Sequence, residues 1–242
     1  MNKIKTIYIS YWFNELDNNP ASKVYELEDE VRSIIDEPLH FAEDNDRNNL
    51  IIPRIQGISH DNKYLFTVSY INAILTINVN DITIDEAVLL INSNIQLFYD
   101  IIKRIYNIDI LYSSVKLEMI DDTKKAKENL IKCLNQENRD YDNLTIKKGF
   151  RKDSYYINYF MEYTTEYTFD FKKEYSENDV FNKSMVTSLK DGKKIKEYLF
   201  TVIEVNDRYA YNLDSAYRTT KDELRGLIME IKDILNKEDY WK

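Results

Sequence analysis

The chain has 242 residues, of which 43% are hydrophobic and 31% are charged, a composition typical of soluble globular proteins and not of disordered ones. Its formal net charge is −9 at pH 7 and its basic residues are interspersed with acids, so direct nucleic-acid binding is disfavoured. With four glycines and three prolines, the sequence also excludes collagen-like repeats, propellers and glycine-rich nucleotide loops.

The first part of the chain predicts strands around one short helix. Apolar residues at helical spacing predict a helix over residues 23–36, which Pro38 ends. Residues 60–63 predict a hairpin turn between two strands. Aromatic and β-branched residues predict the strands themselves, at residues 4–13, 50–59, 64–71 and 73–79.

A long helix follows these strands and is the clearest element of the sequence. It begins with the capping box Thr-x-x-Glu, in which Thr83 and Glu86 each satisfy a free backbone N–H of the first turn. A continuous apolar stripe then extends to about Tyr106. A strand over residues 111–119 completes a first half, residues 1–120.

The second half, residues 121–242, is predicted to begin with a charged connector helix at residues 121–138. The segment 207–214 fits no single element. A last helix begins near Lys221, after a second capping box formed by Thr220 and Glu223. The strands of this half are predicted at residues 155–172, 185–189 and 196–205.

The pentapeptide Tyr-Leu-Phe-Thr-Val occurs twice, at residues 64–68 and 198–202, and each copy precedes a capped helix. This order suggests an internal duplication, with a chance repeat in a chain rich in these residue types as the alternative. In both copies, alternation places Tyr, Phe and Val on one face of a strand and Leu and Thr on the other. We therefore expect an α+β protein with two similar halves, each an antiparallel sheet covered by a long helix.

Few residues suit catalysis or metal binding. His40, His60 and Cys133 lie far apart in the sequence, which makes a zinc site and a catalytic histidine improbable, and we expect no cofactor. No Gly-x-Ser-x-Gly elbow and no phosphate-binding loop is present, so no catalytic residue is predicted. Because Cys133 is the only cysteine and no apolar run reaches membrane-spanning length, we expect a cytoplasmic protein without a membrane partner.

An alternative is a Mg²⁺-dependent nuclease or phosphodiesterase that uses only carboxylates. Its site would combine Asp170 and Lys172 with a further acid such as Glu162 or Glu204. Alternating solvent-facing charge is the commoner reason for such an acid–x–lysine pair.

Two regions suit recognition of another protein. Residues 26–46 are the most acidic segment, typical either of a solvated helix or of a docking surface for a basic partner. Residues 155–172 carry tyrosines of one parity, which suit an interface, although a coding bias toward tyrosine is an alternative. The candidate residues are Glu26, Glu30, Asp36, Glu37, Glu43, Asp44, Tyr155, Tyr159, Tyr163 and Tyr167.

The strand at residues 4–13, the helix at residues 83–106, the segment Ser-Val-Lys-Leu-Glu at residues 114–118 and the final helix form one pattern. This pattern resembles a family of sporadically distributed, uncharacterised prokaryotic proteins of similar length, and the resemblance spans most of the chain. It implies no activity and no catalytic residues. Sporadic distribution implies a link to phages, mobile elements or defence systems.

From these patterns we predict a non-enzymatic interaction protein, acting as an inhibitor or regulator. Its partner would be another protein with a basic surface, or a second copy of the chain. A small-ligand sensor with a tyrosine-lined pocket between sheet and helix is a further alternative.

Overall fold

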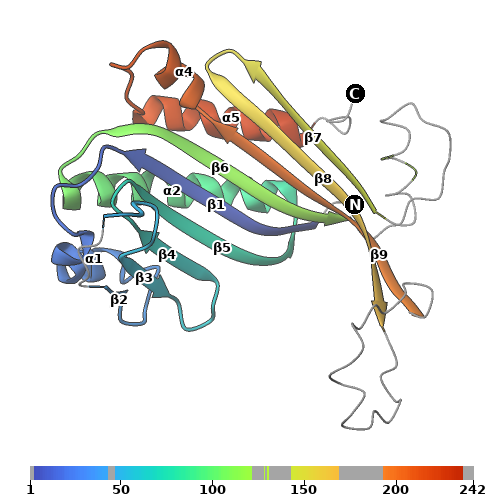
Figure 1. Ribbon diagram of the computed structural model, residues 1–242, viewed down its shortest axis with the longest axis horizontal. Coiled ribbons are helices and arrows are strands. Elements are labelled where there is room, and N and C mark those ends of the chain that lie inside the picture. The colour runs from blue at the N-terminus through green and yellow to red at the C-terminus, as the bar shows by residue number, and fades with distance from the viewer. Residues whose placement is uncertain are drawn as a thin grey trace, which may run out of the picture.

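A computed structural model describes residues 3–42, 47–121, 128, 130, 143–168 and 193–236, and shows a mixed α+β protein with one large antiparallel sheet (Figure 1). In these residues nine strands pair in the order β2-β3-β4-β5-β1-β6-β9-β8-β7. Their bounds are Lys3–Phe13 (β1), His40–Phe41 (β2), Ile55–Ile58 (β3), Tyr64–Val68 (β4), Asn72–Ile82 (β5), Ile110–Asp121 (β6), Asn143–Lys152 (β7), Tyr155–Thr168 (β8) and Lys193–Asn206 (β9).

The expectation of a separate sheet for each half is wrong, because β1 and β6 pair along their length at the centre and join both halves. Local patterns cannot reveal this pairing, since it joins strands that α2 separates in the sequence. The predicted boundary at residues 120 and 121 falls at the end of β6.

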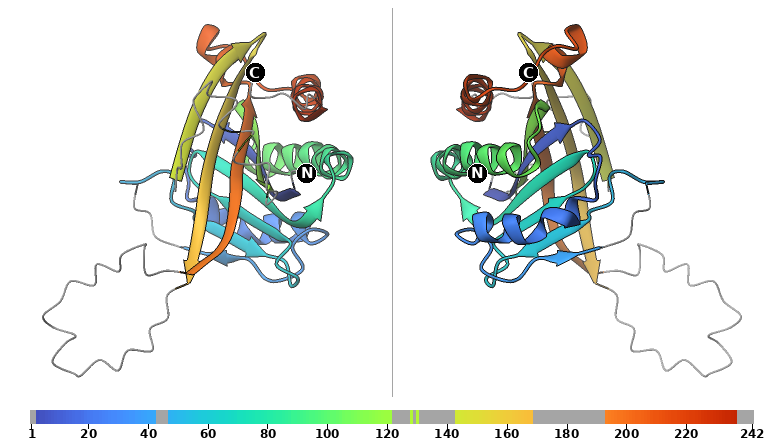
Figure 2. Two further views of the ribbon diagram at one scale, coloured as in Figure 1. Left: turned by 90° about the vertical axis from the view of Figure 1, so that its right-hand side faces the viewer. Right: turned by 90° about the vertical axis from the view of Figure 1, so that its left-hand side faces the viewer.

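Three of the described helices lie on one side of the sheet, as Figure 2 shows. These helices are α1 (Val24–Val31), which follows a 3₁₀ turn at Pro20–Lys23, α2 (Ile84–Tyr106) and α5 (Lys221–Asn236). Helix α2 packs against β1 and β5, and α5 packs against α2, β6 and β9. We call this side of the sheet the helix face and the opposite side the open face. None of the helices in the described ranges is long and apolar enough to cross a membrane.

Both predicted capping boxes are confirmed. Glu86 N–H donates to Thr83 Oγ1 (3.3 Å), and Thr83 N–H donates to the Glu86 carboxylate (2.8 Å). Thr220 and Glu223 make the same two contacts at 3.4 and 3.2 Å. Asn107, in the left-handed conformation (φ 50°, ψ 51°), ends α2, so the sequence signals for this helix act locally at both ends.

The main core lies between the helix face and α2 and α5. Ile7 of β1 is opposite Ile77 of β5 and Leu117 of β6, and all three side chains are buried. The ring of Phe98 from α2 meets the ring of Phe66 edge-on at 5.4 Å. Tyr11 is fully buried and donates its hydroxyl to the Ile95 carbonyl of α2, and burial raises its pKa well above the ordinary value.

Several boundaries differ from the predictions for physical reasons. Strand β3 is only four residues long and begins after Pro53, which lacks a backbone N–H for pairing. Helix α1 ends at Val31, where its carbonyl accepts from two later N–H groups in a tight turn. Strand β7 was not predicted, because its cations obscure apolar alternation. The predicted strand at residues 185–189 and nearly all of the connector helix fall outside the described residues.

The two pentapeptide copies do not occupy corresponding places. The first copy is β4, which β5 separates from α2, whereas the second lies in β9, which leads through α4 (Arg208–Leu213) to α5. The expectation that the same residues face the core is also wrong. Phe66 and Val68 are buried in the first copy, but Leu199 and Thr201 are buried in the second.

Candidate functional site

The acidic residues predicted on α1 are exposed, and both have partners within the chain. Glu26 pairs with Lys23 at the start of the helix (2.6 Å). Glu30 pairs with Arg104 in the last turn of α2. These contacts tie α1 to its neighbours, and each is worth little at the surface.

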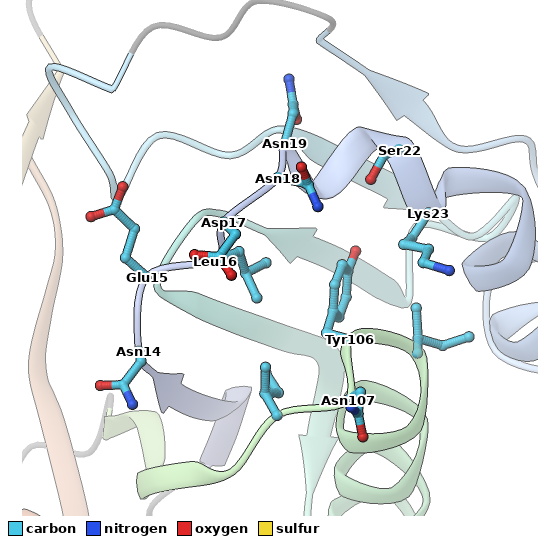
Figure 3. A pocket seen from close by; sticks show the side chains of 12 residues that line it. Asn14, Glu15, Leu16, Asp17, Asn18, Asn19, Ser22, Lys23, Tyr106 and Asn107 are labelled. Atoms are coloured by element: carbon cyan, nitrogen blue, oxygen red, sulfur yellow. The ribbon is translucent and has the colours of Figure 1, made fainter.

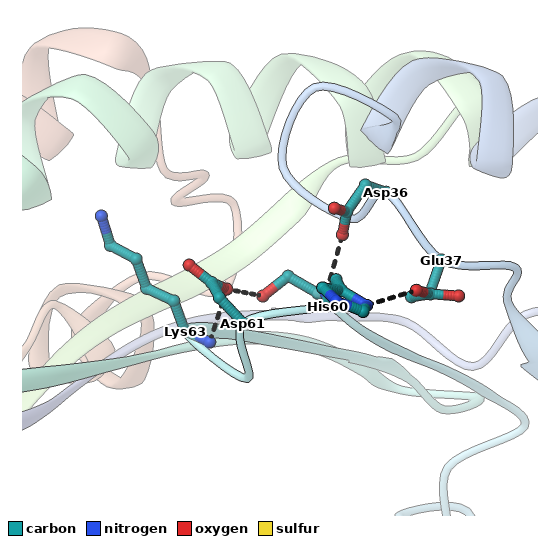
Figure 4. A network of polar contacts seen from close by, with 6 residues as sticks. Asp36, Glu37, His60, Asp61 and Lys63 are labelled. Atoms are coloured by element: carbon teal, nitrogen blue, oxygen red, sulfur yellow. Dashed lines mark hydrogen bonds and ion pairs between the residues drawn. The ribbon is translucent and has the colours of Figure 1, made fainter.

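The next two predicted acids, Asp36 and Glu37, hold the turn between β3 and β4 (Figure 4). Asp36 accepts from the backbone N–H of His60 (2.8 Å), and Glu37 contacts His60 Nδ1 (3.0 Å). Within the same turn the Ser59 hydroxyl donates to Asp61 (2.6 Å) and lowers the pKa of that carboxyl. The described acids are thus distributed over several local contacts. Glu43 and Asp44 lie outside the described residues.

Three of the tyrosines predicted in β8, Tyr155, Tyr159 and Tyr163, point toward the helix face and not toward a free surface. Tyr159 and Tyr163 are buried, with 5% and 2% of their surfaces exposed. The Tyr155 hydroxyl lies against Gly226 of α5 and leaves no room for a Cβ at that position. Burial, followed by the Asp207 charge, raises the pKa of Tyr155 to about 12.

Tyr167 also lies in β8, opposite Lys194 of β9. Glu162 and Glu204 lie on the open face in different cross-strand rows. Glu204 is opposite Asn158, which precedes Glu162 by four residues along β8, a separation of about 13 Å. Asp170 and Lys172, the other members of the carboxylate alternative, lie outside the described residues.

A row of residues on the open face crosses five strands. Strand pairing places Tyr8, Lys116, Glu204, Asn158 and Gly149 side by side from β1 to β7. The Lys116 ammonium lies 3.8 Å from the centre of the Tyr8 ring. The Asn158 side-chain amide donates to Glu204 at 3.2 Å. A cation–π contact and a carboxylate–amide pair therefore lie in the middle of the sheet.

Lys116 also pairs with Glu118, two residues along β6, at 3.0 Å. Burial, together with the nearby Glu118 charge, raises the pKa of the Tyr8 phenol to about 12. Tyr8 therefore remains a neutral hydroxyl over the physiological pH range.

Aromatic rings and cations alternate on both sides of this row. Toward α4, the rings of Tyr156 and Tyr209 meet edge-on at 5.1 Å, and the Arg151 guanidinium lies 5.3 Å from the Tyr209 ring. On the other side, the Lys147 ammonium lies 5.6 Å from the Phe160 ring. Both of these cations come from β7.

The same arrangement recurs at the start of β6. Trp12 and Tyr112 stack at 5.6 Å with an interplanar angle of 14°. Tyr211 of α4 lies 5.9 Å from Tyr112, and the Arg208 guanidinium lies 5.5 Å from the same ring. Short helix α4 therefore borders the open face with tyrosine and arginine.

A buried carboxylate, Asp207, holds α4 in this position. It is 1% exposed and accepts from Ser113 N–H (2.5 Å), the Tyr217 hydroxyl (2.8 Å) and the Thr219 hydroxyl (2.8 Å). Burial raises the pKa of Asp207, and these hydrogen bonds act in the opposite direction. The network links the end of β9 to β6 and to the segment before α5.

A depression of about 360 Å³ lies on the open face beside β7. Gly149 contributes no side chain to it, and Phe160 and Val202 provide apolar lining. A Cβ at Gly149 would come 3.0 Å from Asn158 Oδ1. The missing side chain is therefore one reason why this part of the surface is hollow.

A second depression, of about 330 Å³, lies between the segment after β1 and the end of α2 (Figure 3). Tyr106 rises into it from the last turn of α2 (Figure 3). Glu15, at its rim, pairs with Arg47 at 2.8 Å. Across the described ranges, no group of three or more His, Cys, Asp and Glu side chains is arranged to hold a metal ion.

No family model, curated protein or solved structure matches the chain. The open face therefore has to be interpreted from its own residues. Sequence reasoning missed β7, although Lys-Lys-Gly-Phe-Arg-Lys at residues 147–152 is a distinctive basic and aromatic segment in an acidic chain. This local reversal of charge is the signal by which the sequence could have revealed the strand.

Proposed function

We propose that this protein is a non-catalytic recognition protein that binds another protein through its open face. The observation that carries the proposal is the set of aromatic rings with cations beside them, on the sheet surface opposite α2 and α5. Tyrosine, tryptophan and arginine are the side chains that most often dominate the energy of protein interfaces.

Contacts within the open face favour tight binding at low entropic cost. The rings of Trp12 and Tyr112 already stack on one another, and Asp207 ties α4 to β6. Side chains that are held before binding lose less rotamer freedom when a partner arrives. The surface is therefore suited to bind with little rearrangement.

The acidic segment is a weaker candidate for the main contact surface. The described carboxylates of Glu26, Glu30, Asp36 and Glu37 each contact a lysine, arginine or histidine side chain or a backbone N–H of the same chain. A basic partner would have to compete with these contacts. It would also meet charges that are screened at physiological ionic strength.

We also propose that the two halves arose by duplication, and the strand order supports this. Outward from the centre the strands run β1-β5-β4-β3 on one side and β6-β9-β8-β7 on the other. Each half contains a first strand, a three-strand meander and a capped helix, α2 or α5, and in the first half α1 and β2 come before the meander. Helix α4 belongs only to the second half, and β7 is longer and more basic than β3, its counterpart in the first half, so the proposed surface lies where the halves differ.

Photo-crosslinking tests the proposed function. A benzophenone amino acid at Tyr112 of the open face, and at Leu89 as the control, would be irradiated in extracts of the native host. Leu89 is 67% exposed on α2, and Tyr112 is half-buried on the open face, so both probes have surface that a partner can reach. We expect a discrete crosslinked protein from Tyr112 and not from Leu89.

The captured partner would then be purified and its affinity measured. We expect the double variant Tyr156→Ala/Tyr209→Ala to weaken binding by at least about tenfold, since hot-spot residues each contribute more than ~1 kcal/mol. Leu89→Ala should leave the affinity unchanged. A partner captured only from Leu89, or turnover of nucleotides or nucleic acid by the purified protein, would contradict the proposal.

A further inference from the structure

Among the described residues, strand β7 forms one end of the sheet and pairs along one side, with β8. It is ten residues long, and the residues from Lys147 to Arg151 are exposed. An edge strand of this length presents a row of backbone groups that another strand can complete. The question is which kind of strand this edge accepts.

The charges on β7 limit the answer. The strand carries Lys147, Lys148, Arg151 and Lys152 and no acid, in a chain of net charge −9. Lys152 is already engaged on the helix face by Glu230 (2.7 Å). Edge lysines disfavour pairing with a like-charged strand, so a second copy of β7 is repelled and a strand with acids is not.

Gly149 lies between the two cations that β7 presents on the open face. Lys147 and Arg151 are two residues from it in either direction, so all three positions share one face. The missing side chain at Gly149 leaves room for a depression, which Phe160 and Val202 line. A large aromatic side chain on a neighbouring strand is the usual means of covering such a glycine.

We propose that β7 accepts an extended acidic segment of a partner protein as a tenth strand. An aromatic residue of that segment would lie opposite Gly149, with acidic residues two places before and after it, opposite Lys147 and Arg151. The pattern acid–x–aromatic–x–acid reads the same in both directions, so it fits a parallel or an antiparallel strand. The inference rests on the proposed function and specifies the partner's chemistry.

A synthetic peptide tests the inference directly. The probe is fluorescein-labelled Ser-Thr-Glu-Thr-Tyr-Thr-Glu-Thr-Ser, measured by fluorescence anisotropy with the full-length protein at two salt concentrations. Two further peptides carry N-methyl groups, either on Glu, Tyr and Glu or on the two threonines between them. The N–H groups of successive residues in a strand point to opposite edges, so only one of the two methylated sets faces β7. We expect that set to lose at least about tenfold in affinity and the other set to bind as before.

Protein variants test the side-chain contacts. We expect Lys147→Glu/Arg151→Glu and Gly149→Thr each to weaken peptide binding at least about fivefold. Lys148→Glu is the control, since it reverses a charge of the same strand on the opposite face. It should weaken peptide binding less than either of the other variants. Circular dichroism and the melting temperature establish that each variant is folded.

Three binding results would each overturn the inference. They are equal effects of both methylated sets, equal binding of a peptide with the same residues in scrambled order, and tighter binding of oligothymidylate than of the peptide through Lys147 and Arg151. A β7-dependent dimer of the protein in sedimentation would also overturn it, because the edge would then accept its own copy. If the partner still crosslinks at Tyr112 but the peptide does not bind, the inference fails and the proposed function stands. Loss of both would contradict the proposed function as well.

Discussion

The two copies of Tyr-Leu-Phe-Thr-Val have the same five residues and opposite orientations in the same sheet. In β4, Phe66 lies opposite Leu75 of β5 and packs on Phe98 of α2. In β9, the corresponding Phe200 lies on the open face, opposite Ile120 of β6. The pentapeptide is therefore compatible with either face, and pairing with neighbouring strands decides which residues are buried.

The largest expected effect concerns the phenylalanine of each copy. Phe66→Ala should lower the free energy of unfolding by about 3–5 kcal/mol, because it removes a ring that is 1% exposed and leaves a cavity in the main core. Phe200→Ala should cost less than about 1.5 kcal/mol, since its ring is partly solvated. Denaturant unfolding of both variants measures the difference, and equal losses would invalidate the assigned faces.

The leucines should show the reverse order. Leu199 is 2% exposed and packs with Met161 and Tyr163 in a second apolar cluster, so Leu199→Ala should cost about 2–4 kcal/mol. Leu65 is half-buried on the open face, and Leu65→Ala should cost less than about 1 kcal/mol. The same unfolding assay applies. A larger loss for Leu65 would imply a register shift in β4 or β9.

The segments that follow the two copies also differ, and Asp207 tests the second one. Asp207→Ala should destabilise the protein by about 1–3 kcal/mol, because it leaves the buried Ser113 N–H without its acceptor. After the first copy, the corresponding turn depends on Ser69 and Asn72 and contains no buried carboxylate.

The pH dependence gives a second test at Asp207. Burial raises its folded-state pKa above the ordinary value of 3.8, so the folded state retains a proton that the unfolded chain has lost. The contribution of the Asp207 carboxyl to the free energy of unfolding is therefore complete below about pH 4, and it is lost as the pH rises through the folded-state pKa. Relative to Asp207→Asn, the wild type should become less stable over this range in unfolding experiments. A difference in the free energy of unfolding that does not change with pH would mean that burial does not penalise ionisation of the Asp207 carboxyl.

The smallest expected effect concerns the threonines. Thr201 Oγ1 is buried without a hydrogen-bond partner in the described part of the chain, so Thr201→Val should stabilise the protein by about 1 kcal/mol. Thr67 is half-buried on the open face, and Thr67→Val should change stability by less than about 0.5 kcal/mol. Thermal unfolding of the two variants compares them, and a destabilised Thr201→Val would point to a hydrogen bond at this hydroxyl.

Elements whose signals are local were predictable from the sequence. The capping box at Thr83, the apolar stripe of α2 and the turn before β4 each depend on residues within one or two helical turns or one hairpin. The β1–β6 pairing and the choice of which face of β8 lies against the helices were not predictable, because they depend on strands distant in sequence. The choice of Tyr159 as a surface residue was wrong for this reason.

The candidate site was still harder to predict. Tyr8, Lys116, Glu204 and Asn158 come from four strands, and only the register brings them into one row. Their residue types carry no motif that sequence alone could recognise. The basic segment of β7 is the exception, since its charge pattern is continuous in the chain.

The central position of β1 has a consequence for synthesis on the ribosome. Once α2 has left the exit tunnel, both strands needed for the β1–β5 pair are available, whereas β6, the other neighbour of β1, is not. Until Asp121 has emerged, the nascent chain exposes an eleven-residue edge rich in isoleucine and tyrosine. We expect a translational pause that holds β6 inside the exit tunnel, after α2 has emerged, to promote aggregation, and a pause after Asp121 has emerged to be tolerated.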